Sequence, residues 1–320
     1  MKLLDNARGN IAEGFCLVKS CDARTSKNGK VYLDLTLSDN GGDISAKFWD
    51  YIPETHGIFE SGSVIKVRGV ITEWQGSPQL KVERIRRRTD EDVVDMSELV
   101  AAAPVSPDGM YGSILTFAKS FRNAELSKIV VYLLEKNREA LLVAPAAMRM
   151  HHAYMGGILY HTSAILSAAK GVCAAYPFLD CELVYAGVIL HDLAKTKELE
   201  YSEVGVPSGY TVWGNLIGHL VGGAIEIEKA ADICGTSAEL RIKLQHIILS
   251  HHGVPEFGSP VAPMFPEAEV VSSLDDLDAT LFQMLKAMSE TNPGEMTQRV
   301  FGLDRKLYNH GKDGEYLPKI

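Results

Sequence analysis

The hydrophobic pattern changes its period once along this chain, near Asp90, and this change limits what the chain can fold into. Before Asp90, apolar residues alternate with polar ones, a period of two that is typical of half-buried strands. Beyond Gly109, apolar residues recur at every third or fourth position, which is typical of helices. We therefore predict a multidomain, mainly α protein with a small β domain at the N-terminal end.

Five strands are predicted in the first part, at residues 15–18, 31–37, 43–49, 63–71 and 80–85. Turn residues separate several of them, at Asn28-Gly29, at Asn40-Gly41-Gly42 and at Gln75-Gly76-Ser77-Pro78. Asn and Gly suit these turns because both tolerate a positive φ. Five short strands within about 75 residues suit a small Greek-key barrel such as the OB-fold. We assign residues 1–90 to this barrel.

The helical part begins after a connector that is rich in Ala and Pro, and we assign residues 91–110 to this linker. An all-α domain is predicted over residues 111–292, and the weakly periodic residues 293–320 form a C-terminal tail. Seven helices are expected in the domain, at residues 113–121, 125–142, 157–176, 181–195, 215–234, 237–250 and 267–288.

Charge is distributed unevenly over these parts. The 320 residues carry a net charge of −9, which argues against a protein whose whole surface binds nucleic acid. Residues 1–90, however, carry 14 Lys and Arg against 12 Asp and Glu, a net charge of +2. The acidic excess therefore lies in the helical part, and a local basic face on the barrel remains possible.

The five cysteines form no C-x-x-C pair and are odd in number, which indicates a reducing compartment. The segment Met1-Lys2-Leu3-Leu4-Asp5 reaches an acid before an apolar signal segment can form. No run of about 18 apolar residues is present. We expect a cytoplasmic protein with no membrane partner.

Eight of the ten histidines fall between residues 151 and 252. His191-Asp192 follows the apolar run 183–190, and burying such a pair is costly unless each member has a partner. A divalent metal is a partner for both, whereas a histidine at a helix C-terminus beside a solvated aspartate is the simpler alternative. His161, His219, His251 and His252 also lie near ends of apolar helices. Imidazole and carboxylate from facing helices suit Zn, Mn, Fe, Ni or Co.

A further helix carries Asp275-Asp276-Leu277-Asp278. At about 100° per residue, Asp275 and Asp278 share one face and Asp276 points away. Spacing alone does not choose between Asp275 and Asp278 as a ligand, and an acidic solvated stripe fits at least one of the three.

The order His161, His191-Asp192, Asp275 resembles the H…HD…D signature of the HD-domain metal-dependent phosphohydrolases. The segments HHAYMGGILYHT (151–162) and ILSHHGVPEFGSPV (248–261) are similar to segments of the YhaM family of 3′→5′ exoribonucleases. That family also joins an OB-fold to an HD domain, and its I-D-x-L-D-A motif places the ligand at Asp275. Tyr160 and Ser272-Ser273 depart from the family pattern, which affects the expected substrate fit.

The resemblance implies two divalent ions. Mn is our first candidate for them, and Fe, Ni and Co are the other candidates. One ion would be held by His161, His191, Asp192 and Asp275, and Asp192 would bridge to a second ion held by His219 and His251. Such a pair lowers the pKa of a bound water toward neutrality. Asp192 and Lys195 are then the catalytic candidates, Lys195 contacting a phosphate oxygen unless it is a solvated lysine. His151 and His252 would contact the phosphate or orient ligands.

The barrel offers candidate substrate contacts at Trp49, Trp74, Arg86, Arg87 and Arg88. Base stacking on aromatic rings contributes about 1–3 kcal/mol per base, and cations bind phosphates. The alternatives are aromatic residues of the barrel core and a solvated arginine run.

Three functions therefore follow, in order of preference. The first is a metal-dependent 3′→5′ exoribonuclease that releases nucleoside 5′-monophosphates from single-stranded RNA, with single-stranded DNA as a further candidate substrate. The second is a phosphohydrolase of free nucleotides or cyclic phosphodiesters. The third is a nucleic-acid-binding protein with a structural metal site. The resemblance also leads us to expect a homo-oligomer.

Overall fold

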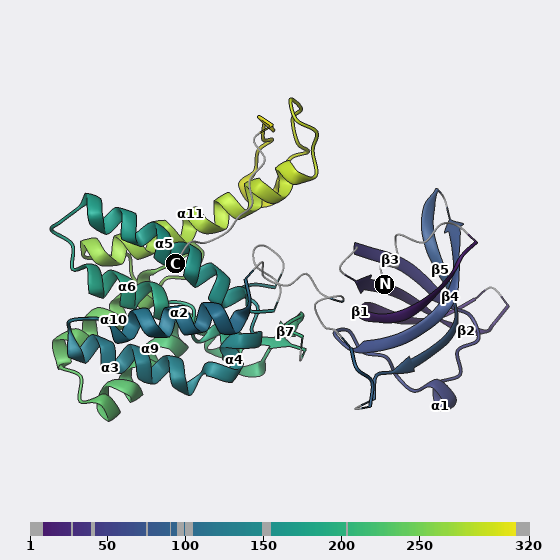
Figure 1. Cartoon of the computed structure of the whole chain (residues 1–320), viewed down its shortest axis with the longest axis horizontal. Coiled ribbons are helices and arrows are strands. Elements are labelled where there is room, and N and C mark those ends of the chain that lie inside the picture. Colours follow the sequence, from purple (N-terminus) through teal and green to yellow (C-terminus); the bar gives the residue numbers. More distant parts are fainter. Residues whose placement is uncertain are drawn as a thin grey trace. The chain divides into compact units, whose positions relative to one another are not determined.

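The computed structural model describes residues 9–311 except 27, 40–41, 75, 90, 95–98, 100–104, 149–154 and 203. The chain forms two compact units (Figure 1). The first comprises Met1–Ala102 with Tyr201–Ser208, and the second comprises Ala103–Glu200 with Gly209–Ile320.

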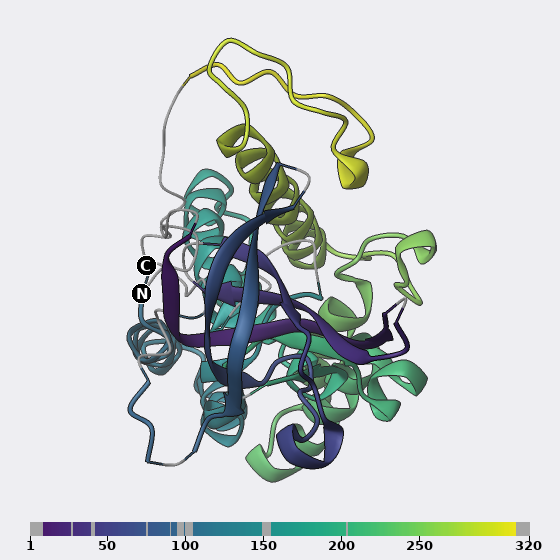
Figure 2. The same ribbon diagram turned by 90° about the vertical axis from the view of Figure 1, so that its right-hand side faces the viewer.

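The first unit contains a closed five-stranded barrel with the strand order β1-β2-β3-β5-β4 (Figure 2). The strands are β1 (Ile11–Thr25), β2 (Val31–Asp39), β3 (Gly42–Phe48), β4 (Val64–Trp74) and β5 (Ser77–Arg87). Neighbours are antiparallel except β3 and β5, which pair in parallel. A short helix, α1 (Pro53–His56), lies between β3 and β4 in the sequence. The predicted OB-type barrel is therefore confirmed.

The two-residue period of the sequence produces the barrel core. Leu33, Leu35 and Leu37 of β2 are buried, as are Ile44 and Phe48 of β3. Four of the five strands are longer than predicted, whereas β3 has its predicted length. Trp74 of β4 pairs with Ser77 of β5, so the turn between these strands is tighter than expected. At the bulge in this pair, a Cβ on Gly69 would lie 2.2 Å from the carbonyl oxygen of Lys81, so only glycine fits.

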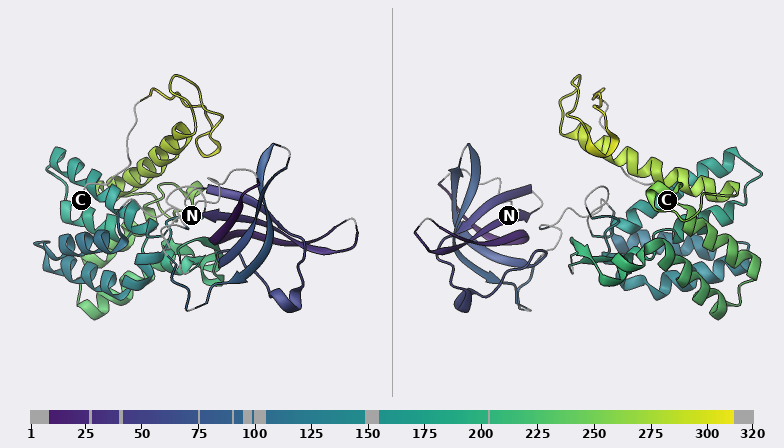
Figure 3. Two further views of the ribbon diagram at one scale, coloured as in Figure 1. Left: turned by 45° about the vertical axis from the view of Figure 1, so that its right-hand side comes forward. Right: turned by 180° about the vertical axis from the view of Figure 1, so that it is seen from behind.

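The second unit is a helical bundle (Figure 3). Its helices are α2 (Pro107–Lys119), α3 (Ala124–Lys136), α4 (Arg138–Val143), α5 (Gly157–Ala175), α6 (Cys181–Leu190), α7 (Lys195–Glu198), α8 (Val212–Leu216), α9 (Gly218–Cys234), α10 (Ala238–Ser250) and α11 (Pro266–Ser289). A 3₁₀ turn at Pro255–Phe257 lies between α10 and α11 in the sequence, and another at Phe301–Leu303 follows α11. Every predicted helical segment is mainly helical, which confirms the helical domain.

The boundaries differ from the prediction in three ways. α2 begins at Pro107, before its predicted start, because Ser106 caps it by accepting a hydrogen bond from the amide of Gly109 at 3.1 Å. Three predicted helices are each divided into two, at Asn137, after Leu190 and at Ile217. A small hairpin, β6 (Leu199–Tyr201) and β7 (Pro207–Tyr210), was not predicted because strands this short carry no readable period.

Helix α6 occupies the centre of the bundle and brings His191-Asp192 there. A Cβ on Gly187 would lie 2.8 Å from Cγ2 of Ile247 on α10 and 3.0 Å from Cγ2 of Val271 on α11. The missing side chain therefore lets three helices approach closely at the level of the histidines. Within the part of the chain that the structure describes, no helix is both long and apolar enough to cross a membrane.

Candidate metal centre

A buried cluster of imidazole and carboxylate groups lies at the meeting point of five helices. His161 belongs to α5, His191 and Asp192 directly follow α6, His219 belongs to α9, His251 follows α10, and Asp275 belongs to α11. The structure therefore brings together all six residues that the sequence suggested as ligands.

The two oxygens of Asp192 face different pairs of imidazoles. Oδ2 lies 3.7 Å from Nε2 of His161 and 3.5 Å from Nε2 of His191. Oδ1 lies 3.6 Å from Nε2 of His219 and 3.6 Å from Nε2 of His251. One carboxylate thus lies between two separate sets of nitrogen donors.

Further donors complete each set. Oδ1 of Asp275 lies 3.0 Å from Nε2 of His161 and 3.8 Å from Nε2 of His191, on the first side. His252 lies on the second side, its Nε2 3.3 Å from Nε2 of His219. Among the described residues, two groups of three have donor atoms within 4.8 Å of one another: His161, His191 and Asp192, and His219, His251 and His252.

Two of the imidazoles are oriented by backbone carbonyls. Nδ1 of His191 donates to the carbonyl of Val188 at 2.8 Å, and Nδ1 of His251 donates to the carbonyl of Ile248 at 2.7 Å. A carbonyl oxygen only accepts, so the proton of each ring lies on Nδ1. Each Nε2 therefore presents a lone pair to the cluster.

Two further imidazoles are oriented by carboxylates for which the sequence analysis did not predict this role. Nδ1 of His161 lies 2.7 Å from Oδ2 of Asp278, and Nδ1 of His219 lies 2.9 Å from Oε2 of Glu198. Glu198 also accepts a hydrogen bond from the amide of His219 at 3.0 Å. Such partners fix the ring orientation of a metal ligand. The three-residue spacing from Asp275 could have indicated Asp278, whereas no sequence signal indicated Glu198.

Lys195 lies against the central carboxylate. Its Nζ is 2.7 Å from Oδ2 of Asp192, and its side chain is 13% exposed. Of the remaining candidates, His151 lies outside the described residues, and Tyr160, one of the departures from the family pattern, is buried.

The carboxylates of the cluster are ionised. Burial opposes the charge of Asp192, but Lys195 and the neighbouring imidazoles more than offset it, so the pKa of Asp192 lies well below its usual value. The pKa of Asp275 is lowered in the same way, chiefly through its contact with His161 against the effect of burial. Burial also opposes the charge of Lys195, but Asp192 outweighs it and raises the pKa of Lys195.

The imidazoles differ in protonation. Burial lowers the pKa values of His219, His251 and His252, which keeps these rings neutral near pH 7. Burial acts in the same direction on His161, but hydrogen bonds to Asp275 and Asp278 outweigh it and raise its pKa to about 10. In the metal-free chain, His161 therefore carries a proton between two carboxylates.

Two buried atoms show that the cluster suits a cation. Oδ1 of Asp192 and Nε2 of His251 have no hydrogen-bond partner among the described residues, and they face each other at 3.6 Å. Both atoms present lone pairs, and unsatisfied buried acceptors are costly. A divalent ion near them would satisfy both, and imidazole with carboxylate is a donor set suited to Mn, Fe, Co, Ni or Zn.

The two candidate tryptophans of the barrel lie on its surface. Trp49 is 44% exposed and stacks on Tyr32, with ring centroids 4.4 Å apart and an interplanar angle of 26°. Nζ of Lys47 lies 5.6 Å from the centroid of the Tyr32 ring. Trp74 is 65% exposed at the end of β4, whereas Phe48 belongs to the core.

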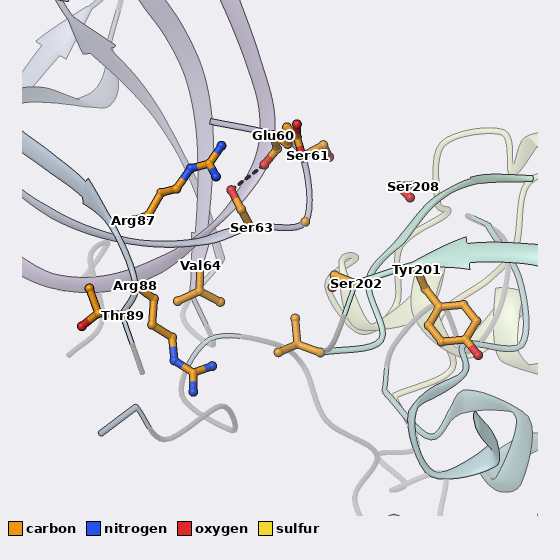
Figure 4. A pocket seen from close by; sticks show the side chains of 12 residues that line it. Glu60, Ser61, Ser63, Val64, Arg87, Arg88, Thr89, Tyr201, Ser202 and Ser208 are labelled. Atoms are coloured by element: carbon orange, nitrogen blue, oxygen red, sulfur yellow. Dashed lines mark hydrogen bonds between the residues drawn. The ribbon is translucent and has the colours of Figure 1, made fainter. Parts of the chain in front are cut away.

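The three candidate arginines do not form one surface. Arg86 makes two hydrogen bonds to Asp92, at 2.6 and 2.7 Å, and Nε of Arg87 donates to the carbonyl of Ile58 at 3.0 Å. Figure 4 shows the Arg87 and Arg88 side chains leaving the chain in different directions, near the hydrogen bond that Ser63 donates to the carbonyl of Glu60. Arg86 and Arg87 thus support the barrel, a role that the sequence run did not reveal.

Two family models match this chain. Residues 158–280 match the family model of the HD domain, and residues 17–87 match that of the OB-fold nucleic acid binding domain. The second OB-fold domain of replication protein A from Methanococcus maripaludis is 16% identical, covering 30% of this chain and 98% of that chain with a TM-score of 0.24. The single-stranded DNA binding protein of Thermus aquaticus is 17% identical, covering 27% of this chain and 43% of that chain with a TM-score of 0.24.

The chain therefore has an N-terminal OB-fold barrel followed by a helical HD domain, the domain of metal-dependent phosphohydrolases.

Proposed function

We propose that this protein is a metal-dependent 3′→5′ exoribonuclease that releases nucleoside 5′-monophosphates from single-stranded RNA. The observation that carries the hydrolase part is the position of Asp192, with one oxygen toward each of two imidazole pairs. The substrate class is supported by the exposed aromatic pair on an attached barrel. The direction of degradation rests on the resemblance to the YhaM family.

The residues of the centre fit two divalent ions, for which Mn is our first choice. His161, His191, Asp192 and Asp275 would hold one ion, and Asp192, His219 and His251 would hold the other. We assign His252 to the second ion as well, because its donor atom lies within 4.8 Å of those of His219 and His251; the sequence had suggested only that it contacts the phosphate or orients ligands. Two ions in such a site activate water and stabilise the charge that develops on the leaving oxygen.

The residues of the chain prepare this site in two ways. The acceptors at each Nδ1 hold the imidazole rings so that every Nε2 faces the cluster, and this orientation needs no rearrangement when ions bind. Lys195 is a buried cation at the edge of the centre, and we assign it to a phosphate oxygen of the substrate in addition to Asp192.

The barrel would hold the strand. Tyr32 and Trp49 offer stacked rings for nucleobases, with Lys47 beside them for a phosphate. Trp74 offers a second exposed ring at the end of β4. Rings and cations of this kind bind single strands with little sequence preference, because every base has a π-face.

Labelled oligonucleotides test the proposal directly. The metal-loaded protein is incubated with oligoribonucleotides labelled at the 5′ or the 3′ end, with the matching oligodeoxyribonucleotides, and with free and cyclic nucleotides. Stepwise shortening of the 5′-labelled RNA, with release of labelled monophosphate from the 3′-labelled RNA, supports the proposal. Turnover of nucleotides alone supports the alternative phosphohydrolase, and binding without turnover supports a structural metal site.

We also propose a cytoplasmic location and a homo-oligomeric state. The location is supported by the free cysteines, three of which are buried as small apolar residues. The oligomeric state rests on the family resemblance alone, and light scattering of the purified protein measures it.

A further inference from the structure

The outer face of β1, β4 and β5 carries cations in two rows. In one row, Glu13 on β1 lies opposite Arg68 on β4, which lies opposite Arg84 on β5. In the next row, Phe15 lies opposite Lys66, which lies opposite Arg86. Positions two residues apart share one face of a strand, so the rows are neighbours. Lys66, Arg68, Arg84 and Arg86, which we call the cationic grid, line a groove of about 460 Å³.

The register places like charges directly across a strand pair twice. Lys66 lies opposite Arg86 and Arg68 lies opposite Arg84. Like charges at directly opposite positions destabilise a sheet. The arrangement therefore costs stability unless anions lie over it.

The carboxylates of the barrel neutralise the cations of the grid only in part. Glu13 lies 3.5 Å from Lys66 and 3.6 Å from Arg68, and Glu83, which lines the same groove, lies 4.0 Å from Arg68. These side chains are 36–49% exposed, and exposed ion pairs contribute only about 0–1 kcal/mol. Arg84 has no acid within 4.0 Å among the residues that the structure describes, and Arg86 alone is held by a close two-point contact, with Asp92.

An aromatic ring lies within the grid. Nζ of Lys66 is 5.6 Å and Cζ of Arg86 is 5.9 Å from the centroid of the Phe15 ring. These cation–π contacts hold the two charged heads on the outer face rather than leaving them free to extend into water.

The grid and the aromatic pair lie on different parts of the barrel. Tyr32 and Trp49 lie on β2 and just after β3, whereas the grid is centred on β4. In the closed order β1-β2-β3-β5-β4, strand β4 pairs with neither β2 nor β3. A strand that occupies the aromatic pair therefore reaches the grid only by continuing around the barrel.

We propose that the cationic grid is a second polynucleotide surface, which binds the phosphates of a single strand that extends beyond the aromatic pair. A linear polyanion suits it because charge repeats along the strand as the cations repeat along β4 and β5. The identity of the polyanion rests on the proposed function. The consequence is a preference for long strands over short ones.

The test uses the full-length protein in EDTA, so that binding is measured without hydrolysis. Lys66→Ala/Arg84→Ala removes one cation that Glu13 meets only at 3.5 Å and one that has no acid within 4.0 Å among the described residues. Lys229→Ala/Lys243→Ala removes two exposed cations of the helical unit, each with an acid within 4.0 Å, as a control matched in charge. Fluorescence anisotropy gives the affinity for oligoribonucleotides of about 24 and about 6 nucleotides, since one OB-fold covers about 4–16 nucleotides. Thermal unfolding of each variant is recorded alongside.

The grid variant is expected to bind the long strand about tenfold more weakly at about 0.1 M salt, with a salt slope smaller by about 1.4. Its affinity for the short strand stays within about twofold of the wild type, and the control variant changes neither. Equal losses in the grid and control variants, equal losses for both strand lengths, or no loss at all overturns the proposal. Tight binding of a long RNA that the metal-loaded protein never shortens contradicts the proposed nuclease activity but not this surface.

Discussion

His161 lies between two carboxylates of a single helix, its Nδ1 2.7 Å from Asp278 and its Nε2 3.0 Å from Asp275. The three-residue spacing on α11 places both acids on the face toward α5, whereas Asp276 between them is exposed. Asp275 thus lies beside the nitrogen that faces the cluster, and Asp278 holds the opposite side of the ring. This division gives the two acids separable functions.

Asp278→Asn should weaken metal binding without removing a ligand. Loss of the carboxylate behind a metal-bound histidine typically lowers affinity by about 10–100-fold, because the ring is less well oriented and less basic. Titration with Mn, followed by calorimetry, measures the change. Asp276→Asn on the same helix is the matched control and should bind as the wild type does. Equal Mn affinities of Asp278→Asn and Asp276→Asn would show that the contact between Asp278 and His161 does not contribute to metal binding.

Asp192→Ala should abolish hydrolysis and leave RNA binding intact. Within the part of the chain that the structure describes, Asp192 is the residue whose two oxygens face both imidazole pairs, so its loss affects both candidate ion sites, whereas the barrel is unchanged. Activity on labelled RNA, elemental analysis and anisotropy in EDTA are measured on the same preparation. Retention of a tenth of the wild-type activity, or of two ions per chain, contradicts the bridging role.

Metal binding should release a proton and strengthen as the pH rises. The pKa of His161 is raised to about 10 in the metal-free chain, above its ordinary value of 6.5, and an ion needs the lone pair that this proton occupies. Binding at pH 7.5 should therefore release about one proton from His161, and affinity should rise about tenfold per pH unit until pH 10 is approached. Calorimetry in two buffers of different ionisation enthalpy counts the protons.

The same pKa shift predicts how the stability of the metal-free protein depends on pH. A folded-state pKa above the unfolded value means that the contribution of His161 is fully present below pH 6.5 and is lost as the pH rises through about 10. Asp278→Asn should reduce both the proton release on metal binding and the loss of stability as the pH rises. Urea unfolding in EDTA between pH 6 and pH 10 measures this change in stability. A wild-type protein that gains stability over this range contradicts the raised pKa of His161.

Trp49→Ala and Phe48→Ala should separate binding from stability. Trp49 is exposed and stacked on Tyr32, so its loss should weaken RNA binding by about 1–3 kcal/mol, with little effect on unfolding. Phe48 is buried in the barrel, so its loss should destabilise the protein by about 3–5 kcal/mol. Anisotropy and denaturant unfolding of both variants check the contrast. Unchanged RNA affinity in Trp49→Ala removes the aromatic pair from the substrate path.

The part of the fold that follows from local periodicity could be predicted from the sequence. The structure shows the alternation directly, with Phe48 buried and Trp49 exposed, whereas the sequence analysis left open which of the aromatic residues belong to the core. The apolar run before His191-Asp192 likewise indicated a buried helix that ends at the centre. The spacing of Asp275 and Asp278 left a choice open for a physical reason, since both acids share the face and both contact His161.

The remaining contacts join segments that no local pattern connects. Glu198 lies in a short helix, α7, and only tertiary packing brings it to His219. The arginine run looked like one basic surface, yet Arg87 contacts the carbonyl of Ile58, twenty-nine residues earlier. Such pairings depend on strand register and loop path, which the residue order alone does not specify.

The four Nδ1 contacts have a consequence for mutational robustness. Within each imidazole pair that faces Asp192, one ring is held by a main-chain carbonyl and the other by a side-chain carboxylate. A point substitution at Asp278 or Glu198 can therefore release His161 or His219. No substitution deletes a main-chain carbonyl, so His191 and His251 keep their orientation whichever side chains stand at positions 188 and 248, provided that the helix persists. Each half of the centre therefore keeps one histidine whose ring orientation a single substitution does not readily change.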